Sequence, residues 1–158
     1  MIIWLRGMSS SGKTTIAKAV KEKYKSSRST VIIDGDEVRS GLSSGLGHEY
    51  DSIIENCRRM AEVCSLIEPQ VDIVILACMA PSIASRETIK QVFNKNKVEF
   101  VEIFCHADCE VLKKRDTKGI YNSRLGHVYY CTNEDFDIGI DTHELTVDEC
   151  VNIVSSYI

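Results

Sequence analysis

Hydrophobic residues along this chain follow two patterns in turn: short continuous apolar runs, and longer stretches in which apolar residues recur about one helical turn apart. The first pattern is typical of buried strands and the second of amphipathic helices. The predicted strands are residues 2–7, 29–36, 71–81, 98–107 and 138–142. The predicted helices are residues 12–27, 52–70, 85–96 and 146–158, and segment 109–121 begins as a helix and runs into a polar loop.

The predicted helix at 52–70 has a well-defined apolar face. Its inward residues are expected to be Ile54, Cys57, Ala61, Cys64 and Ile67. Pro69 is expected to mark the end of the helix, because proline cannot continue the helical hydrogen bonding.

The alternation of strands and helices predicts parallel strands joined by helical crossovers. Run 71–81 is the most hydrophobic and is expected to be a central strand, and continuous apolar strands fit a sheet covered on both faces. A chain of 158 residues suits one compact domain, and it contains no internal repeat or linker. Residues 1–158 are therefore predicted to form a single α/β domain with a parallel sheet flanked by helices.

Composition argues against several functional classes, namely nucleic-acid-binding, membrane-spanning and secreted proteins. A formal net charge of −4 argues against a broad nucleic-acid surface, which would carry an excess of basic residues. No apolar run is long enough to cross a bilayer, and the first residues lack the basic region and apolar core of a signal peptide. We therefore expect a cytoplasmic protein with no nucleic-acid or membrane partner. The seven cysteines form no CxxC pair, which favours free thiols over a zinc site.

The segment "GMSSSGKT" matches the phosphate-binding loop G-x-x-x-x-G-K-[ST] through Gly7, Gly12, Lys13 and Thr14. A predicted strand precedes it and a predicted helix follows, so the fold class becomes a three-layer, P-loop NTPase-type fold. The glycines allow backbone amides to face phosphate oxygens at a helix N-terminus. Lys13 is expected to reach the β- and γ-phosphates and Thr14 to bind Mg²⁺. The predicted ATP-binding residues of this loop are Gly7, Ser9, Ser10, Ser11, Gly12, Lys13, Thr14 and Thr15. A simple serine–glycine turn is the alternative.

Two acids follow the second predicted strand, in "DGDEVR". Ligands of parallel α/β sheets bind at the carboxyl ends of the strands. Asp34 and Asp36 could therefore organise Mg²⁺ or accept a proton from an attacking hydroxyl, and Arg39 could bind an anionic acceptor. The alternative is a helix cap, with Asp36 on the helix N-terminus.

Three further polar segments could contribute. Arg58 and Arg59 point to different sides of a helix, so at most one should face a cleft. The alternative is a solvated surface position or an ion pair with Glu55 or Glu62. Arg115 could stack on a base or neutralise phosphate, although its loop would be unremarkable alone. The irregular, polar and aromatic segment 121–137 is a candidate lid.

These segments together resemble the adenylylsulfate kinase family. The resemblance rests on "IWLRGMSSSGKTT", "DGDEVRSGL" (34–42), "LG" (46–47), "ENCRRMAE" (55–62), "RDTKGIY" (115–121) and "IDT" (140–142), in order over nearly the whole chain. It implies an ATP-dependent kinase, commonly a homodimer, that uses ATP with Mg²⁺ and phosphorylates the 3′-hydroxyl of adenylylsulfate in sulfate assimilation.

The resemblance also assigns roles by position. Asp36 and Lys13 become the catalytic candidates, with Asp36 as base or as the acid on the metal side, and Thr14 and Asp36 as metal ligands. Arg115 would border ATP. The acceptor would be bound by Asp34, Arg39, His48, Asn56 and Lys118.

Departures from the family pattern gather on the acceptor side. His48 stands where a phenylalanine stacks on the acceptor base, and Ile53 replaces an arginine that holds the acceptor's anionic group. Ala80 and Ile83 replace a serine and an arginine, and Cys131 replaces a second aromatic residue, for which Tyr129 or Tyr130 could substitute. These changes leave two alternatives open: a different nucleotide acceptor such as cytidine diphosphoramidate, or a nucleotide-binding module without phosphate transfer.

Overall fold

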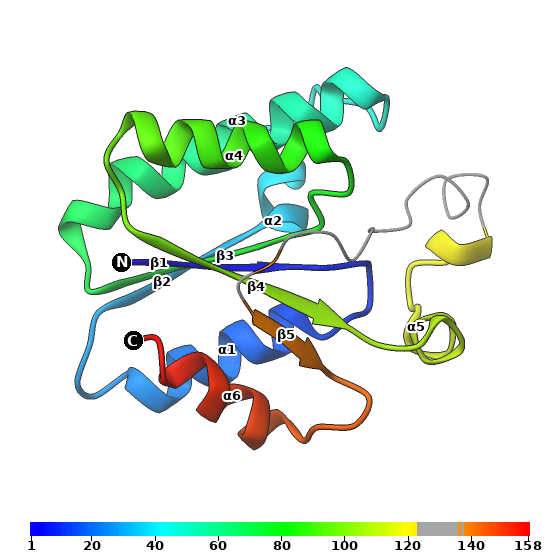
Figure 1. Ribbon diagram of the computed structural model, residues 1–158. Helices are drawn as coiled ribbons and strands as arrows, with labels where there is room; N and C mark the ends of the chain where they lie inside the picture. Colours follow the sequence, from blue (N-terminus) through cyan, green and yellow to red (C-terminus); the bar gives the residue numbers. More distant parts are fainter. Residues whose placement is uncertain (123–135, 137) are drawn as a thin grey trace.

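A computed structural model describes residues 1–122, 136 and 138–158. Within these residues a parallel sheet has the strand order β2-β3-β1-β4-β5 (Figure 1). The strands are β1 (Ile2–Arg6), β2 (Thr30–Asp34), β3 (Ile73–Cys78), β4 (Phe100–His106) and β5 (Ile138–Asp141). All four pairings are parallel, which confirms the fold predicted from the alternation of strands and helices.

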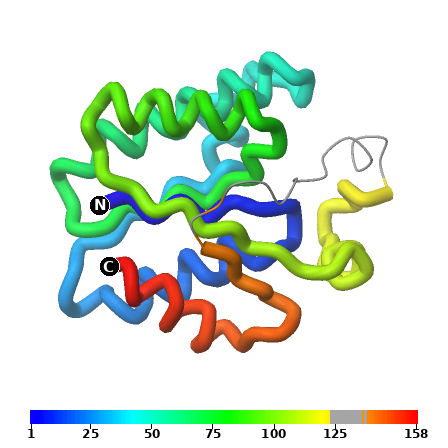
Figure 2. Tube along the Cα trace, in the orientation of Figure 1, coloured from blue at the N-terminus to red at the C-terminus, as the bar shows by residue number. Residues whose placement is uncertain are grey.

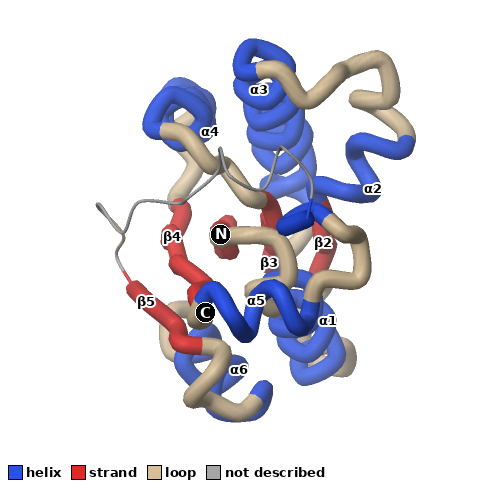
Figure 3. The backbone as a smooth tube through the Cα atoms, turned by 90° about the vertical axis from the view of Figure 1, so that its right-hand side faces the viewer, coloured by secondary structure: helices blue, strands red, loops and turns tan. Residues whose placement is uncertain are grey.

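Helices cover both faces of this sheet. Helices α3 (Tyr50–Ile67) and α4 (Ile83–Lys95) pack together on one face, while α1 (Lys13–Tyr24) and α6 (Val147–Ser155) pack together on the other (Figures 1 and 3). Two shorter helices, α2 (Gly35–Ser40) and α5 (Cys109–Arg115), follow β2 and β4 directly. One-turn 3₁₀ helices lie at Glu68–Gln70 and Ile120–Asn122. None of the described helices combines the length and apolar composition that crossing a bilayer would require.

The core is divided in two by the sheet. Ile2 and Trp4 of β1 belong to the apolar cluster beneath α3 and α4, whereas Ile3 and Leu5 belong to the cluster beneath α1 and α6. Successive side chains of a strand point to opposite faces, so each β1 residue serves one layer in turn. Strands β1 and β3 are buried throughout, as expected for central strands covered on both faces.

The structure corrects three details of the sequence interpretation. Ile53, rather than Ile54, is buried on the inner face of α3, and the α-helix ends at Ile67, before the 3₁₀ turn that contains Pro69. Both isoleucines fit a helical apolar stripe. The packing of α3 against the sheet and against α4 decides which of the two is buried. The second strand also ends at Asp34, because the Asp34 side chain starts helix α2 there.

The carboxyl ends of the parallel strands meet at one edge of the sheet. The loops after β1, β2, β3 and β4 emerge there, while both chain ends lie at the opposite edge (Figure 2). The phosphate-loop motif, the "DGD" acids and the "RDTKG" loop are thereby brought to the same edge from distant parts of the sequence.

Candidate active site

The phosphate loop adopts the predicted conformation between β1 and α1. Gly7 has φ +151° and Gly12 φ +86°, both in the region that favours glycine. A side chain at Gly7 would overlap the carbonyl oxygen of Cys105 on β4, so the loop needs glycine at its first position. The Ile16 amide donates to the Gly12 carbonyl at 2.9 Å, which starts α1 directly after the loop.

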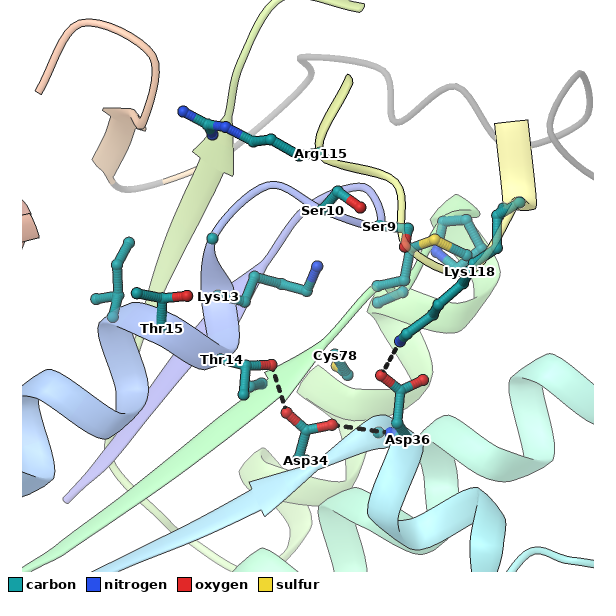
Figure 4. A pocket seen from close by; sticks show the side chains of 18 of the residues that line it. Ser9, Ser10, Lys13, Thr14, Thr15, Asp34, Asp36, Cys78, Arg115 and Lys118 are labelled. Atoms are coloured by element: carbon teal, nitrogen blue, oxygen red, sulfur yellow. Dashed lines mark hydrogen bonds and ion pairs between the residues drawn. The ribbon is translucent and has the colours of Figure 1, made fainter. Parts of the chain in front are cut away.

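Lys13 and Thr14 begin α1 and lie on the inner side of the loop (Figure 4). The Lys13 Nζ donates to the Met8 carbonyl at 2.6 Å and lies 3.5 Å from Ser11 Oγ. This arrangement folds the ammonium group over the loop, where it can meet a phosphate oxygen. The Thr14 hydroxyl donates to Asp34 Oδ2 at 2.6 Å.

The two acids after β2 have different surroundings. Asp34 is buried, and its Oδ1 accepts a hydrogen bond from the Asp36 amide at 2.9 Å while Oδ2 accepts from Thr14. The helix-capping residue is therefore Asp34, and the capping role considered for Asp36 is wrong. Asp36 lies in the first turn of α2, and its exposed carboxylate forms an ion pair with Lys118.

The acids also differ in what they offer a cation. Thr14 and Asp34 place two oxygen donors side by side, which is the ligand chemistry that Mg²⁺ prefers. The sequence pattern paired Thr14 with Asp36, whereas the structure brings Thr14 into contact with Asp34.

The acceptor-side residues come from α2, α3 and the loop between them. Arg39 Nη1 donates to the Gly47 carbonyl at 2.9 Å, and His48 and Ile53 line the same cavity. Asn56 is 5% exposed, and its Oδ1 has no hydrogen-bond partner among the described residues. A buried acceptor atom of this kind has a desolvation cost unless a ligand donates to it.

The opposite end of the site is built by Arg115 and Thr142. Arg115 donates through Nη1 to Thr142 Oγ1 at 3.1 Å and through Nη2 to the Thr142 carbonyl at 2.9 Å. The Tyr121 hydroxyl donates to the Ser9 carbonyl at 2.7 Å and so holds the outer side of the phosphate loop. In Figure 4, Arg115 lies across the loop from Asp36 and Lys118.

One cavity of about 830 Å³ joins these groups. Of the predicted site residues, those that line it are Ser9, Ser10, Gly12, Lys13, Thr14, Thr15, Asp34, Asp36, Arg39, His48, Asn56, Arg115 and Lys118. Gly7 and Ser11 are buried beneath the loop and shape it from below. The candidate lid at 121–137 lies outside the described residues except for Tyr121, Asn122 and Phe136, and so do Tyr129, Tyr130 and Cys131.

The charged residues of the polar segment on α3 do not line the cavity and instead pair with one another. Arg58 and Arg59 both hydrogen-bond Glu55, and Arg59 also donates to the Leu42 carbonyl at 2.8 Å. These hydrogen bonds, first from Arg58 and then from Arg59, lower the pKa of Glu55 to about 2. The ion-pair interpretation is confirmed, and the network ties the loop after α2 to α3.

Sequence reasoning missed two features near the site. Cys57 and Cys78 line the cavity, and burial raises the pKa of Cys57 to about 12 and that of Cys78 well above its usual value. Arg6, the residue before the phosphate loop, is fully buried in an ion pair with Glu102 of β4. The sequence signal for this pair was a charged residue in each of two apolar strands, Arg6 at the end of β1 and Glu102 inside β4.

A phosphate loop after the first strand of a parallel sheet, facing carboxylates and basic side chains across one cavity, defines a P-loop kinase. Residues 1–139 match the model of the adenylylsulphate kinase family, and the chain belongs to that family.

Individual relatives agree with this assignment. The chain is 36% identical over 167 residues to the adenylyl-sulfate kinase of Marinobacter nauticus, covering 99% of this chain and 83% of that protein. The APS kinase of Mycobacterium tuberculosis in complex with AMPPNP and APS superposes with a TM-score of 0.90 at 27% identity, covering 98% and 95% of the two chains. A hexameric APS kinase from Thiobacillus denitrificans superposes with a TM-score of 0.74 at 27% identity, covering 98% of this chain and 28% of that one.

Proposed function

We propose that this protein transfers the γ-phosphate of ATP to the 3′-hydroxyl of adenylylsulfate. The observation that carries the proposal is the single cavity in which the phosphate loop faces Asp36, Arg39 and Asn56. Donor and acceptor groups on opposite walls of one cavity are what direct transfer between two bound nucleotides needs. Family membership supplies the choice of adenylylsulfate.

The donor side would act through the phosphate loop. Its backbone amides and the Lys13 ammonium would bind the β- and γ-phosphates at the N-terminus of α1. Thr14 and Asp34 would hold Mg²⁺, and the ion would supply positive charge that stabilises the transferring phosphoryl group. Arg115, fixed on Thr142, would border the nucleoside of ATP.

Asp36 is the better candidate for the base. Its carboxylate is exposed to the cavity, whereas both oxygens of Asp34 already accept hydrogen bonds. Asp36 would accept the proton of the acceptor hydroxyl as that oxygen bonds to the γ-phosphorus and ADP leaves. Lys118, now paired with Asp36, would lie beside the acceptor's anionic groups.

One observation favours a second acceptor, such as cytidine diphosphoramidate. Ile53 is buried in the cavity wall where the family resemblance leads us to expect an arginine, so this position cannot supply a positive charge to the acceptor. His48 lines the cavity in place of a stacking phenylalanine. An acceptor with a different base and fewer charges at this position would fit the altered wall.

An ADP-release assay over a panel of nucleotide acceptors tests the proposal. We expect turnover with adenylylsulfate, and Asp36→Asn should lower kcat about 100-fold or more because the general base is lost. The matched control is Glu37→Gln, an exposed acid of the same helix that does not line the cavity, which should retain activity. Turnover with cytidine diphosphoramidate alone would favour the second acceptor. ATP binding without ADP formation for any acceptor would indicate a non-catalytic nucleotide-binding module.

We also propose that the chain forms a homodimer and acts in the cytoplasm in sulfate assimilation. This part of the proposal rests on the family resemblance. Because one relative is hexameric, the size of the oligomer has to be measured. Light scattering of the purified chain should give twice its mass of 17.7 kDa, and a monomer or hexamer would contradict it.

A further inference from the structure

Among the described residues, three buried sulfur-containing side chains line the cavity on its acceptor side, and the proposed kinase mechanism uses none of them. This sulfur cluster consists of Cys57 and Met60 on helix α3 and Cys78 at the end of strand β3. Each side chain is at most 3% exposed, and all three belong to the apolar cluster beneath α3 and α4. Soft sulfur ligands from two elements therefore gather at the floor of the cavity.

Contacts within and around the sulfur cluster hold its members in place. The Trp4 Nε1–H donates to Cys78 Sγ at 3.3 Å, and Asn56 Nδ2 donates to Met60 Sδ at 3.9 Å. Cys57 precedes Met60 by three positions, so the two side chains lie on the same face of α3. Burial raises the pKa of Cys78 well above its usual value, and the neighbouring Cys57 thiol adds to this shift. The two thiols therefore interact, although they come from different elements.

The chemistry of these thiols favours a soft metal ion over other reagents. Because burial raises the pKa of Cys57 to about 12 and that of Cys78 well above its usual value, both are protonated at neutral pH. Oxidation and alkylation need a thiolate, whereas a metal ion displaces the thiol proton as it binds. Structural Zn²⁺ needs a full tetrahedral set of ligands, and the described residues hold no group of three or more His, Cys, Asp or Glu that could bind a metal ion. Thiolate and thioether ligands select Cu(I).

We propose that Cys57, Cys78 and Met60 form a binding site for a soft monovalent metal ion, Cu(I), at the floor of the cavity. On binding, both S–H bonds break, a Cu–S bond forms at each cysteine, and two protons leave to the solvent. No atom is oxidised or reduced in this exchange. The Met60 thioether is the third, neutral ligand. The complex carries one negative charge, which the Lys13 ammonium offsets, since Lys13 acts electrostatically on Cys78.

The bound ion should inhibit phosphate transfer, and this consequence alone rests on the proposed function. The Met60 sulfur that binds the metal is the atom that accepts the hydrogen bond from Asn56, so binding removes a contact of an acceptor-side residue. In Figure 4, Cys78 lies between Thr14 and Asp36. A negatively charged complex at this place opposes the approach of phosphate groups.

Anaerobic titration with Cu(I) tests the site, in a bicinchoninate buffer that holds free Cu(I) below the level at which a single thiol binds it. Trp4 is the chain's single tryptophan and donates to Cys78, so its fluorescence should fall as one ion binds per chain. Two protons should be released with each ion. Cys57→Ala and Cys78→Ala should each lower the affinity about 100-fold or more, because a direct ligand is lost, and Met60→Leu should lower it about 10-fold.

Cys64→Ala is the matched control, because Cys64 is a buried cysteine of α3 that does not line the cavity. It should bind Cu(I) as the unmodified protein does. Cys57→Ser and Cys78→Ser, which keep the side-chain shape, replace an alanine variant that fails to fold. Unchanged fluorescence of the unmodified protein, or equal affinities in all cysteine variants, would overturn the site and leave the proposed kinase function standing.

The kinase assay separates the site from its consequence. Activity should fall with the same midpoint as the Trp4 fluorescence, and Cys78→Ala should resist inhibition at that Cu(I) level. Cu(I) binding that leaves activity unchanged would overturn the inhibition. Cu(I) binding by a chain that phosphorylates no acceptor would support the site and count against the proposed function.

Discussion

Loss of the ion pair between Arg6 and Glu102 should lower the stability of the protein more than loss of any other electrostatic contact beneath the site. Arg6 is fully buried and Glu102 is 2% exposed, so neither charge is solvated by water. The Arg6 guanidinium also lies 4.5 Å from the ring centre of Phe104, and Lys90 Nζ lies 3.0 Å from Glu102 Oε2. Replacing Glu102 by glutamine would keep the shape and leave Arg6 as an uncompensated buried charge.

The expected cost follows from this burial. Removing one partner of a buried ion pair destabilises a protein by about 3–5 kcal/mol, because the remaining charge keeps its desolvation penalty. For a chain of 158 residues, each kcal/mol lowers Tm by about 2–4 °C. Glu102→Gln should therefore lower Tm by roughly 6–20 °C. Lys90→Met should cost only about 1 kcal/mol, because Lys90 is partly exposed and the buried pair remains.

Thermal and urea unfolding of four chains would check this reasoning: the unmodified protein, Glu102→Gln, Lys90→Met, and a double variant with Arg6→Met and Glu102→Leu. The double variant should be more stable than Glu102→Gln, because apolar side chains replace both charges. A cost below about 1 kcal/mol for Glu102→Gln would refute the argument from burial. A double variant less stable than Glu102→Gln would refute it as well.

Two further predictions concern the phosphate loop and helix α3. Gly7→Ala should cost about 1–3 kcal/mol in thermal unfolding, because its side chain would overlap a β4 carbonyl, whereas Gly45→Ala, with open space around it, should be nearly neutral. The second concerns Glu55, whose pKa of about 2 lies below its unfolded value, so its contribution to stability is present above about pH 4.5 and is lost as pH falls toward 2. Melting curves of Glu55→Gln and the unmodified protein should converge over that range, and curves that stay parallel would contradict the role of Arg58 and Arg59.

Local sequence was sufficient for the elements and for the phosphate loop. Glycines at positions 7 and 12, a lysine and a threonine specify a loop whose backbone angles are a local property. The same is true of most strands and helices, because their periodicity reports which face is buried. Among the acceptor-side candidates, Arg39 followed from its position after the second predicted strand. His48, Asn56 and Lys118 were proposed only through the order of motifs that resemble a family.

The partners of those residues were not predictable in the same way. Two acids two positions apart look equivalent in "DGD", but Asp34 caps helix α2 and is buried against Thr14, whereas Asp36 lies in the first turn of α2 and is exposed to Lys118. Lys118 meets Asp36 across 82 positions of sequence, and such a contact leaves no periodic signal. The choice of Ile53 over Ile54 likewise depends on how α3 sits against its neighbours.

The sequence by itself determined the α/β class, the parallel strands and the position of the phosphate loop, since each depends on residues close together in the chain. Only the tertiary structure decided that Arg6 is neutralised by Glu102, that Asp34 accepts a hydrogen bond from Thr14, and that one cavity joins residues from distant parts of the sequence. The physical reason is the strand order β2-β3-β1-β4-β5. Parallel strands can be arranged in many orders at similar local cost, and burial of both sheet faces selects the order that brings these side chains together.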